Sequence, residues 1–489
     1  MELDADACYR IIQARDPRWD GKFFTAVRTT GVYCRPVCPS RLPARRNVTF
    51  FPLAAAAEAA GFRPCKRCRP ETAPGAPAWS GTLTTVRSAL RLIGDGFLDE
   101  HSVPDLAARL GMGERHLRRL FDEHLGAAPA AVAQSRRVHF AARVLRETAL
   151  PLTQVALSAG FGSVRQFNDV FRSVFGDSPS VLRRAAAGPH GLSRRGRLTH
   201  TLTLSYRPPY QWKALLDFFR ARAVAGVEEV DDDSYRRSIA LGGAIGTMHV
   251  SRAARGKDNA LAVSFSGIEP AMLGEAVRRA RRMFDLDSDP AAISEHLVRD
   301  RKLAALVRAR PGLRLPVTWE PFEAVVRAVL GQQVSVAGAI TIAGRLAGRC
   351  GRPLDGDPTL TRVFPGPADV AVADLSNLGA PTARARTIVT VARAVLSGAV
   401  PFDGYTPAEE LQQALVALPG IGPWSAQYVA LRGFGEPDAF PAADLGIRKA
   451  MDARGYPADA RHREAAMQRL SPWRGYAALY LWSTLYGGG

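Results

Sequence analysis

Residues 418–449 read LPGIGPWSAQYVALRGFGEPDAFPAADLGIRK, and this stretch decides how the C-terminal half of the chain is interpreted. Gly420 and Gly422 lie between two apolar helical patterns, and Pro423 suits the first position of a helix. A glycine turn that opens a helix presents unpaired N–H groups, which suit a DNA phosphate. Asp444 follows, and removal of a base from DNA requires such a carboxylate beside an anchored backbone. The alternative is a plain helix–turn–helix in a helical core.

The bulk composition favours a multidomain protein that binds a polyanion. The chain has 489 residues, a length typical of three or four domains, and a net charge of +19. A polyanionic partner is therefore expected, and among polyanions a membrane surface is the weaker candidate because no apolar run approaches a bilayer span. The acidic start MELDADACYR has no apolar signal core, so the chain is expected to stay in the cytoplasm. A monomer is the default expectation.

Four of the six cysteines lie in one 35-residue window, with the spacing Cys34-x3-Cys38 and Cys65-x2-Cys68. Four thiolates at this spacing suit one tetrahedral zinc ion, which would also help a small domain to fold. The alternatives are a disulfide pair or chance. Basic residues outnumber acids around these cysteines, as expected of a surface that meets DNA phosphate.

The segments TGVYCRPVCPSRLP (residues 30–43) and GFRPCKRC (residues 61–68) resemble the N-terminal zinc domain of the bacterial adaptive-response family, Ada. The resemblance implies a methyl-acceptor domain over residues 1–76. It implies that Cys34 accepts a methyl group from a DNA methyl phosphotriester, with Cys34, Cys38, Cys65 and Cys68 as zinc ligands. The expected DNA contacts are Arg41, Arg45 and Arg67.

Charge counting suggests a switch at this site. A zinc ion with four thiolates carries a formal charge of about −2, which repels DNA. Methylation of one thiolate makes the site less negative, so we expect DNA affinity to rise after methyl transfer.

Residues 80–187 contain two similar helical units after a Pro- and Ala-rich linker at residues 73–78. In the first unit, Ser102 with Asp105 predicts a helix start. In the second, Ser163 precedes Phe167, Phe171 and Phe175, whose spacing predicts a buried stripe.

These units resemble the double helix-turn-helix domain of the AraC family, on the turn AGFGS (residues 159–163) and the closing FGDSP (residues 175–179). The resemblance implies recognition helices at 113–123 and 163–174, each entering a major groove. A plain helical adaptor that touches only phosphate is the alternative. The candidate contacts are Arg115, Arg118, Arg119, Arg165 and Gln166.

After a second linker at residues 188–197, the pattern changes to that of a small sheet. Alternating apolar residues predict strands near 202–206 and 261–265, two more between 238 and 250, and a helix at 212–223. Beyond about residue 269 the chain reads helical.

Segments in the order LSYRPPYQW (204–212), RPGLRLP (310–316), LGQQVSV (330–336), the 418–422 turn and Asp444 resemble the 3-methyladenine DNA glycosylase II family, AlkA. The resemblance implies a sheet domain at 198–270 and a helix-hairpin-helix glycosylase domain at 271–489. Asp444 then aligns with the catalytic aspartate, which supports an oxocarbenium-like sugar or orients water. The whole chain is thus expected to be multidomain α+β.

Three aromatic residues are candidates for the base pocket. Trp424 and Tyr428 lie four apart on the helix after the turn and share a face, and Trp482 aligns with another pocket residue. Stacking and cation–π attraction would favour a positively charged alkylated purine. The alternative is ordinary core, which we favour for Trp473.

Gln332 and Gln333 lie where the family inserts a wedge into DNA, and Gln333 replaces an aliphatic residue of a well-known member. No lysine stands where bifunctional relatives place a Schiff-base amine, and Arg432 is not a substitute, so we expect a free abasic site as product. The likeness also implies a monovalent cation at the turn.

The combined expectation is a protein that senses alkylated DNA, activates transcription, with RNA polymerase as a further partner, and excises alkylated purines such as 3-methyladenine. Pro-Cys-His-Arg, the motif of the second adaptive-response methyltransferase domain, is absent from the sequence, so O6-alkylguanine reversal is not expected. Two alternatives stay open. One is a regulator whose glycosylase half only binds DNA, and the other is a glycosylase whose N-terminal half only recruits it.

Overall fold

The computed structural model describes residues 3–75, 84–187, 199–254 and 259–485. The second expected linker lies outside these residues, as does the first from residue 76 onward. Contacts divide the chain into two compact units, which are taken in turn. Unit 1 comprises residues 1–208, 253–278 and 286–289, and unit 2 comprises residues 209–252, 279–285 and 290–489.

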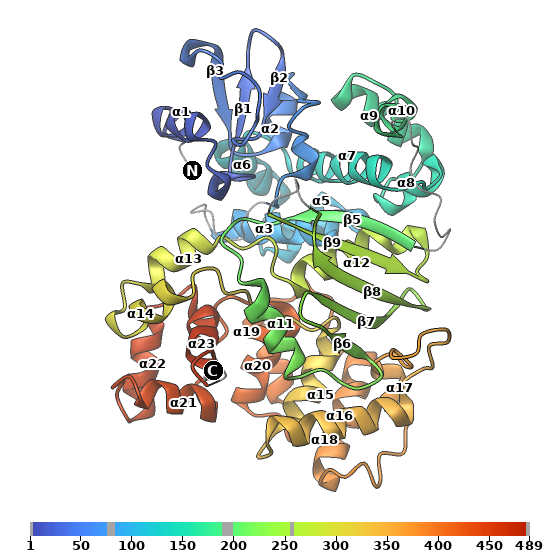
Figure 1. Ribbon diagram of the computed structural model, residues 1–489, viewed down its shortest axis with the longest axis vertical. Helices are drawn as coiled ribbons and strands as arrows, with labels where there is room; N and C mark the ends of the chain where they lie inside the picture. The colour runs from blue at the N-terminus through green and yellow to red at the C-terminus, as the bar shows by residue number, and fades with distance from the viewer. Residues whose placement is uncertain (1–2, 76–83, 188–198, 255–258, 486–489) are drawn as a thin grey trace. The chain divides into compact units, whose positions relative to one another are not determined.

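Unit 1 begins with a small mixed sheet in the order β3-β1-β2-β4 (Figure 1). Strand β1 pairs antiparallel with β2 and β3, and β4 pairs parallel with β2. Buried aromatic rings of Phe24 and Tyr33 meet edge to face in its core. The elements are α1 (Ala5–Ala14), β1 (Phe24–Val27), β2 (Val32–Cys34), β3 (Val48–Phe51), α2 (Ala54–Ala59) and β4 (Arg63–Pro64).

The rest of unit 1 is mostly helical. Ser102 and Asp105 form the expected capping box, and Ser163 caps α9. Phe167, Phe171 and Phe175 form the expected buried stripe. The helices are α3 (Thr84–Asp95), α4 (Phe97–Glu100), α5 (Val103–Arg109), α6 (Glu114–Leu125), α7 (Pro129–Glu147), α8 (Leu152–Ser158), α9 (Val164–Phe175) and α10 (Pro179–Ala187).

Helix α7 is the longest of these helices, and it packs against α3, α8, α9 and α10 (Figure 1). It therefore joins the two helix-turn-helix units into one body. Unit 1 also holds β5 (Thr199–Ser205) and β9 (Ala260–Ser266), which pair antiparallel as their alternating patterns predict.

In unit 2, strands β6, β7 and β8 form antiparallel pairs beside helix α11. The two strands expected between residues 238 and 250 are β7 and β8, and the short β6 is an addition. The bounds are α11 (Trp212–Arg220), β6 (Glu228–Val230), β7 (Ser234–Leu241) and β8 (Ala244–Arg252).

The remainder of unit 2 is helical, as predicted, and α15 packs against α16, α18 and α20 around one apolar core. None of the helices among the described residues has the length and apolar character needed to cross a lipid bilayer. The helices from α12 onward, the first of which crosses the division between the units, are α12 (Leu273–Met283), α13 (Pro290–Leu297), α14 (Arg301–Ala309), α15 (Pro321–Gly331), α16 (Val336–Cys350), α17 (Pro367–Ala371), α18 (Thr382–Leu396), α19 (Ala408–Val416), α20 (Pro423–Phe434), α21 (Leu445–Asp452), α22 (Ala460–Gln468) and α23 (Arg474–Trp482).

Candidate functional site

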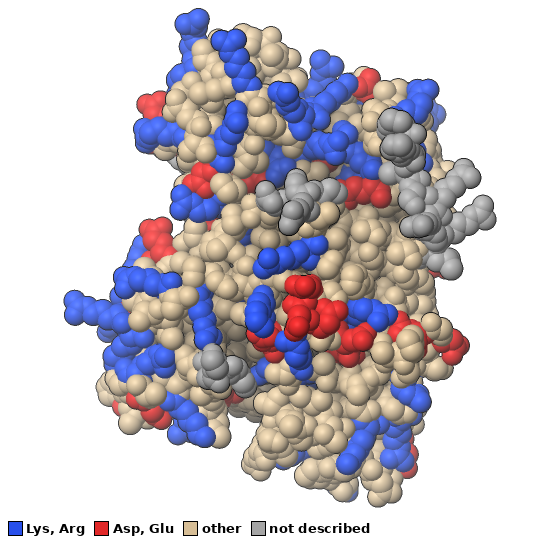
Figure 2. All heavy atoms as spheres, viewed as in Figure 1, with Lys and Arg blue, Asp and Glu red and all other residues tan. Residues whose placement is uncertain are grey.

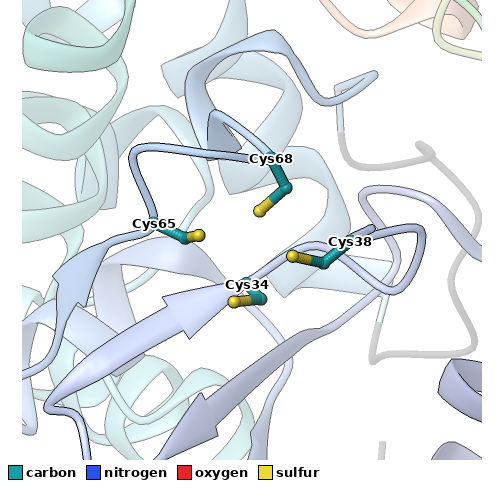
Figure 3. A group of neighbouring side chains, drawn as sticks. All are labelled: Cys34, Cys38, Cys65 and Cys68. Carbon is teal, nitrogen blue, oxygen red and sulfur yellow. The ribbon is translucent and has the colours of Figure 1, made fainter. Parts of the chain in front are cut away.

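The four clustered cysteines are brought together by the pairing of β2 with β4. Val32 lies opposite Arg63 and Tyr33 opposite Pro64, so Cys34 and Cys65 follow at the same end of the two strands. Cys38 and Cys68 return from the loops that come next. The four Sγ atoms lie within 4.8 Å of one another and converge on one point (Figure 3).

This arrangement fits a zinc ion. Zn–S bonds of about 2.3 Å in a tetrahedron place sulfur atoms roughly 3.8 Å apart, which is inside the observed spread. All six cysteines are free thiols, so the disulfide alternative is wrong. Cys34 and Cys38 are half-buried, whereas Cys65 and Cys68 are buried. The first two thiols are therefore the ones that an incoming group could reach.

The basic residues near the cysteines differ in their roles. Arg41 and Arg67 are exposed, as a DNA contact requires. Arg45 is half-buried against the rings of Tyr9 and Phe50 and pairs with Asp6. Lys and Arg side chains are frequent, and acidic ones few, on the face of this region at the top of Figure 2.

Arg35 is an exception to the expected basic surface. Its guanidinium pairs with the buried Asp20 and donates to Thr72 Oγ1 at 2.6 Å, and its backbone N–H points at Cys68 Sγ at 3.4 Å. Arg35 therefore braces the cysteine loop and does not face solvent.

A buried polar contact joins the cysteine region to helix α7. Tyr33, next to Cys34, donates from its hydroxyl to Glu58 Oε1 at 2.7 Å, and the same carboxylate lies 2.7 Å from His139 Nε2 on α7. Burial opposes both charges, but each partner's charge outweighs it, so the pKa of His139 is raised and that of Glu58 lowered. The contact is an ion pair between the two parts of unit 1.

The helices expected to recognise DNA are α6 and α9. The N-terminal turns of both carry exposed polar side chains over a buried apolar face. The exposed candidates are Arg115, Arg118 and Arg119 on α6 and Arg165 and Gln166 on α9. Arg118 also pairs with Glu114 one turn earlier, a weak surface contact that DNA phosphate can replace.

In unit 2, the 418–422 turn connects α19 to α20 as a tight hairpin. Ile421 is buried in the core, while Gly420 is exposed with φ +85°. Gly422, with an ordinary φ of −99°, is the N-cap of α20. Thr387 on α18 lies beneath the hairpin and donates to Pro419 O at 3.2 Å. Its role was not evident from the sequence because it lies some thirty residues away from the turn.

A carboxylate and three aromatic rings meet beside this hairpin. Trp424 Nε1 donates to Asp444 Oδ2 at 3.2 Å, and Trp482 Nε1 donates to Asp444 Oδ1 at 2.9 Å. The ring of Tyr428 lies 5.5 Å from that of Trp424 and 6.4 Å from that of Trp482. The structure thus brings together the four residues that the sequence nominated for base excision.

Asp444 is also the N-cap of α21, because its Oδ1 accepts the backbone N–H of Ile447 at 3.0 Å. Its two oxygens accept three N–H groups, which together fix the orientation of the carboxylate. Trp473 is buried against Tyr476, in agreement with a core role.

The loop between α15 and α16 lies next to the hairpin. Gln332 Nε2 donates to Gly420 O at 3.1 Å and to Ser425 Oγ at 3.2 Å, so this side chain ties the loop to the turn. Gln333 is exposed with φ +55°, a left-handed conformation that is uncommon outside glycine. Val334 and Val336 beside it are also exposed.

Comparison with protein families gives four matches along the chain. In chain order they are the metal binding domain of Ada (residues 7–71), a helix-turn-helix domain (106–185), the AlkA N-terminal domain (201–320) and the HhH-GPD superfamily of base excision DNA repair proteins (326–474). These matches confirm the expected fold class and the order of its parts.

Individual relatives agree. A protein of Mycobacterium tuberculosis named "Probable bifunctional transcriptional activator/DNA repair enzyme AlkA" is 43% identical over 486 residues, covering 99% of this chain and 97% of that protein. Escherichia coli "DNA-3-methyladenine glycosylase 2" is 39% identical over 287 residues, covering 58% of this chain and 96% of its own. A solved 3-methyladenine DNA-glycosylase of Archaeoglobus fulgidus covers 59% of this chain and 99% of its own at a TM-score of 0.50. At 22% identity it shows the fold alone.

Proposed function

Because this chain belongs to the family of bifunctional transcriptional activators and DNA repair enzymes, we propose that it carries out two reactions on alkylated DNA and couples one of them to transcription. The first reaction is hydrolysis of the N-glycosidic bond of alkylated purines such as 3-methyladenine in unit 2. The second is transfer of a methyl group from a DNA phosphotriester to Cys34 in unit 1.

The observation that supports the first reaction is the carboxylate of Asp444 held at the edge of three aromatic rings. The rings of Trp424, Tyr428 and Trp482 offer faces to an extruded base, and a cationic purine gains cation–π attraction that a normal base lacks. Asp444 offers its negative charge to the sugar as the bond breaks. The hairpin at residues 418–422 holds the DNA backbone through N–H groups at the start of α20.

We assign the wedge to the loop with Gln332 and Gln333. Gln332 keeps the loop against the hairpin, and Gln333 reaches outward to fill the space that the base leaves. The product is a free abasic site without strand cleavage, because the only basic side chain on the inner face of α20, Arg432, is a buried guanidinium. A monovalent cation at the hairpin would have to bind carbonyl oxygens that already accept hydrogen bonds. Pro419 O accepts one from Thr387, and Gly420 O accepts one from Gln332.

The experiment for the first reaction measures release of 3-methyladenine from alkylated double-stranded DNA. The unaltered protein is expected to release the base, and Asp444→Asn, which keeps the size and one acceptor oxygen, is expected to lose at least about a hundredfold in rate. Absence of release by the unaltered protein would leave the alternative of a regulator that only binds DNA through unit 2.

For the second reaction, the zinc ion that the four cysteines hold would keep their thiols deprotonated. Cys34 Sγ attacks the methyl carbon, the S–C bond forms, and the C–O bond breaks with its electron pair left on the phosphate oxygen. A neutral phosphotriester does not repel the thiolate. Each molecule acts once, because the thioether at Cys34 is stable.

Mass spectrometry tests this assignment. After incubation with DNA that contains methyl phosphotriesters, the tryptic peptide of residues 29–41 should gain one methyl group, and its fragment ions should place it on Cys34 and not on Cys38. An unchanged mass with zinc bound would leave the N-terminal region as a recruiting module.

Coupling to transcription follows from the contact between the two parts of unit 1. Methylation lowers the negative charge beside Tyr33, whose partners Glu58 and His139 belong to the cysteine region and to α7. We expect the methylated protein to bind its promoter more tightly through α6 and α9 and to engage RNA polymerase there. Equal affinity of both forms for one duplex, at matched salt, would argue against the switch.

A further inference from the structure

Helix α20 carries a third functional candidate on the face that presents the pocket aromatics. Trp424, Tyr428 and Arg432 recur every four residues, so they lie in one stripe along the helix. Arg432 is 3% exposed, and its NH1 group donates to the hydroxyl of Tyr428 at 3.3 Å. The guanidinium therefore lies directly behind the phenol end of a pocket ring.

Arg432 is a buried cation that forms no ion pair with any carboxylate among the described residues. Its Nε donates to the carbonyl of Pro316, and its guanidinium carbon lies 4.5 Å from the ring centre of Phe218. Burial lowers the pKa of Arg432 to about 10, so the group still carries its charge at neutral pH. An unpaired charge is costly to bury, which suggests that the charge itself is used.

Neighbouring arginines show the contrast. Arg237 and Arg327 both bind the carboxylate of Glu323, and Arg327 also binds Glu228. Carboxylates in this part of unit 2 therefore neutralise those two guanidinium groups, while Arg432 is directed to an aromatic hydroxyl.

The charge of Arg432 and the charge of Asp444 lie at opposite ends of the aromatic group. Asp444 accepts hydrogen bonds from Trp424 and Trp482, both rings contact Tyr428, and Tyr428 contacts Arg432. From Trp424 to Arg432 the helix rises about 12 Å, at 1.5 Å per residue. A base held among these rings lies between a fixed negative and a fixed positive charge.

We propose that Arg432 is a positioning residue that holds Tyr428 and whose charge favours departure of a cationic base; this rests on the glycosidic function proposed above. When the bond from C1′ to the purine nitrogen breaks, its electron pair passes to the base. The base becomes neutral and the positive charge moves to the sugar. A cation behind the base favours that movement because it repels the bound cationic base and this repulsion falls as the base becomes neutral. An anion beside the sugar favours it because its attraction grows as positive charge develops there.

The test uses single-turnover cleavage of a duplex with one 7-methylguanine. Arg432→Met keeps much of the side-chain volume and removes the charge. Its cleavage rate constant should fall about tenfold, while the enzyme concentration for half-saturation stays the same or falls, because repulsion of the cationic base is relieved. Arg432→Lys should be faster at pH 6 than at pH 8, relative to the unaltered protein, since burial lowers the pKa of a lysine.

Arg314→Met is the matched control. Arg314 is also buried, donates to the main-chain carbonyls of Asp285 and Pro209, and lies over Tyr210, which is not a pocket ring. Its loss should change thermal stability and leave the cleavage rate constant of the folded protein unchanged.

An unaltered rate constant in Arg432→Met would overturn the proposal. The proposal would also be overturned if both Arg432 variants lost rate and affinity together at every pH, because that result indicates a loosened pocket and not the loss of a charge. Asp444→Asn, run in parallel, separates this outcome from failure of the glycosidic function itself.

Discussion

At the scale of single residues, Asp444 combines a structural role with the chemical role proposed for it. As N-cap it accepts the N–H of Ile447, and the helix N-terminus favours its negative charge. The same oxygens accept the indole N–H groups of Trp424 and Trp482, so the orientation of the carboxylate is set before DNA arrives. Preorganisation of this kind is what electrostatic stabilisation of a developing charge requires.

Trp482→Phe tests this preorganisation. The substitution keeps a ring near Tyr428 but removes the 2.9 Å hydrogen bond to Asp444 Oδ1, so the single-turnover rate of base release should fall about tenfold. Trp473→Phe makes the same change at a buried tryptophan of the core and should leave the rate of the folded protein unchanged. Equal rates for Trp482→Phe and the unaltered protein would show that the indole donor is dispensable.

Individual residues also show where sequence patterns mislead. The density of arginines around the cysteines predicted a basic surface, yet Arg35 points inward and Arg45 lies against two rings. The amino-acid composition gives the number of charged side chains but not where they point, because a guanidinium on a long side chain can reach a buried acid as easily as solvent.

At the scale of an element, the hairpin at residues 418–422 depends on one glycine for its shape. Gly420 has φ +85°, and a Cβ atom there would lie 2.1 Å from Thr387 Oγ1. A Cβ atom at Gly422 would meet nothing within 4 Å. The hairpin backbone therefore requires glycine at position 420 but has room for a side chain at position 422, although the two glycines look equivalent in the sequence.

The pair Gly420→Ala and Gly422→Ala separates these roles. Gly420→Ala should lower the melting temperature of the protein, because the left-handed backbone costs at least about 1 kcal/mol with a side chain and Thr387 must move. Gly422→Ala should melt like the unaltered protein but bind undamaged duplex less tightly, since its methyl group enters the space left for phosphate. Calorimetry and a DNA titration measure both effects. Identical melting of the two variants would contradict the assignment.

Helix α15 holds the buried ionic cluster that supports unit 2. Glu323 accepts from Arg237 at 2.9 Å and from Arg327 at 2.6 Å, with its own side chain 1% exposed. Burial by itself would raise the pKa of Glu323, but the two arginine charges outweigh burial and lower it.

Glu323→Gln should lower the free energy of unfolding by about 3–5 kcal/mol at pH 7, because the buried Arg237 loses its counter-charge and Arg327 keeps only Glu228. The exposed pair of Glu295 with Arg299 supplies the control, and Glu295→Gln should have no measurable effect. Urea unfolding measures both variants.

The same carboxylate sets a pH dependence. A lowered folded pKa means that the stabilising charge is fully present above the usual value of 4.5 and is lost as the pH falls through the lower folded value. The difference in stability between the unaltered protein and Glu323→Gln should therefore be constant from pH 7 to about pH 5 and shrink below pH 4.5. A difference that shrinks already above pH 6 would refute this explanation.

At the scale of the whole molecule, the two proposed reactions belong to two compact units, each with its own core. The net charge of +19 serves both, because both meet the same polyanion. Among the described residues, side chains that could hold a metal ion are grouped at the four cysteines of unit 1, where zinc is expected to support folding.

Removal of zinc should therefore separate the two activities. A chelator is expected to abolish methylation of Cys34 and to expose residues 28–69 to trypsin, while release of 3-methyladenine continues at its former rate. The same chelator already saturated with zinc is the control. Parallel loss of base release would show that unit 2 depends on the metal.

The sequence by itself determined the order of the parts and nominated the residues of the candidate sites. Cysteine spacing, glycine turns and a four-residue aromatic repeat are local patterns, and local patterns follow from backbone geometry that neighbouring residues share. Only the tertiary structure decided which distant groups meet. Asp444 with Trp482, Gln332 with the hairpin, Thr387 beneath Gly420 and Tyr33 with His139 are contacts across tens of residues, set by packing of whole helices. The tertiary structure also decided which partner each buried charged side chain faces, because the free-energy cost of burying the charge depends on that partner.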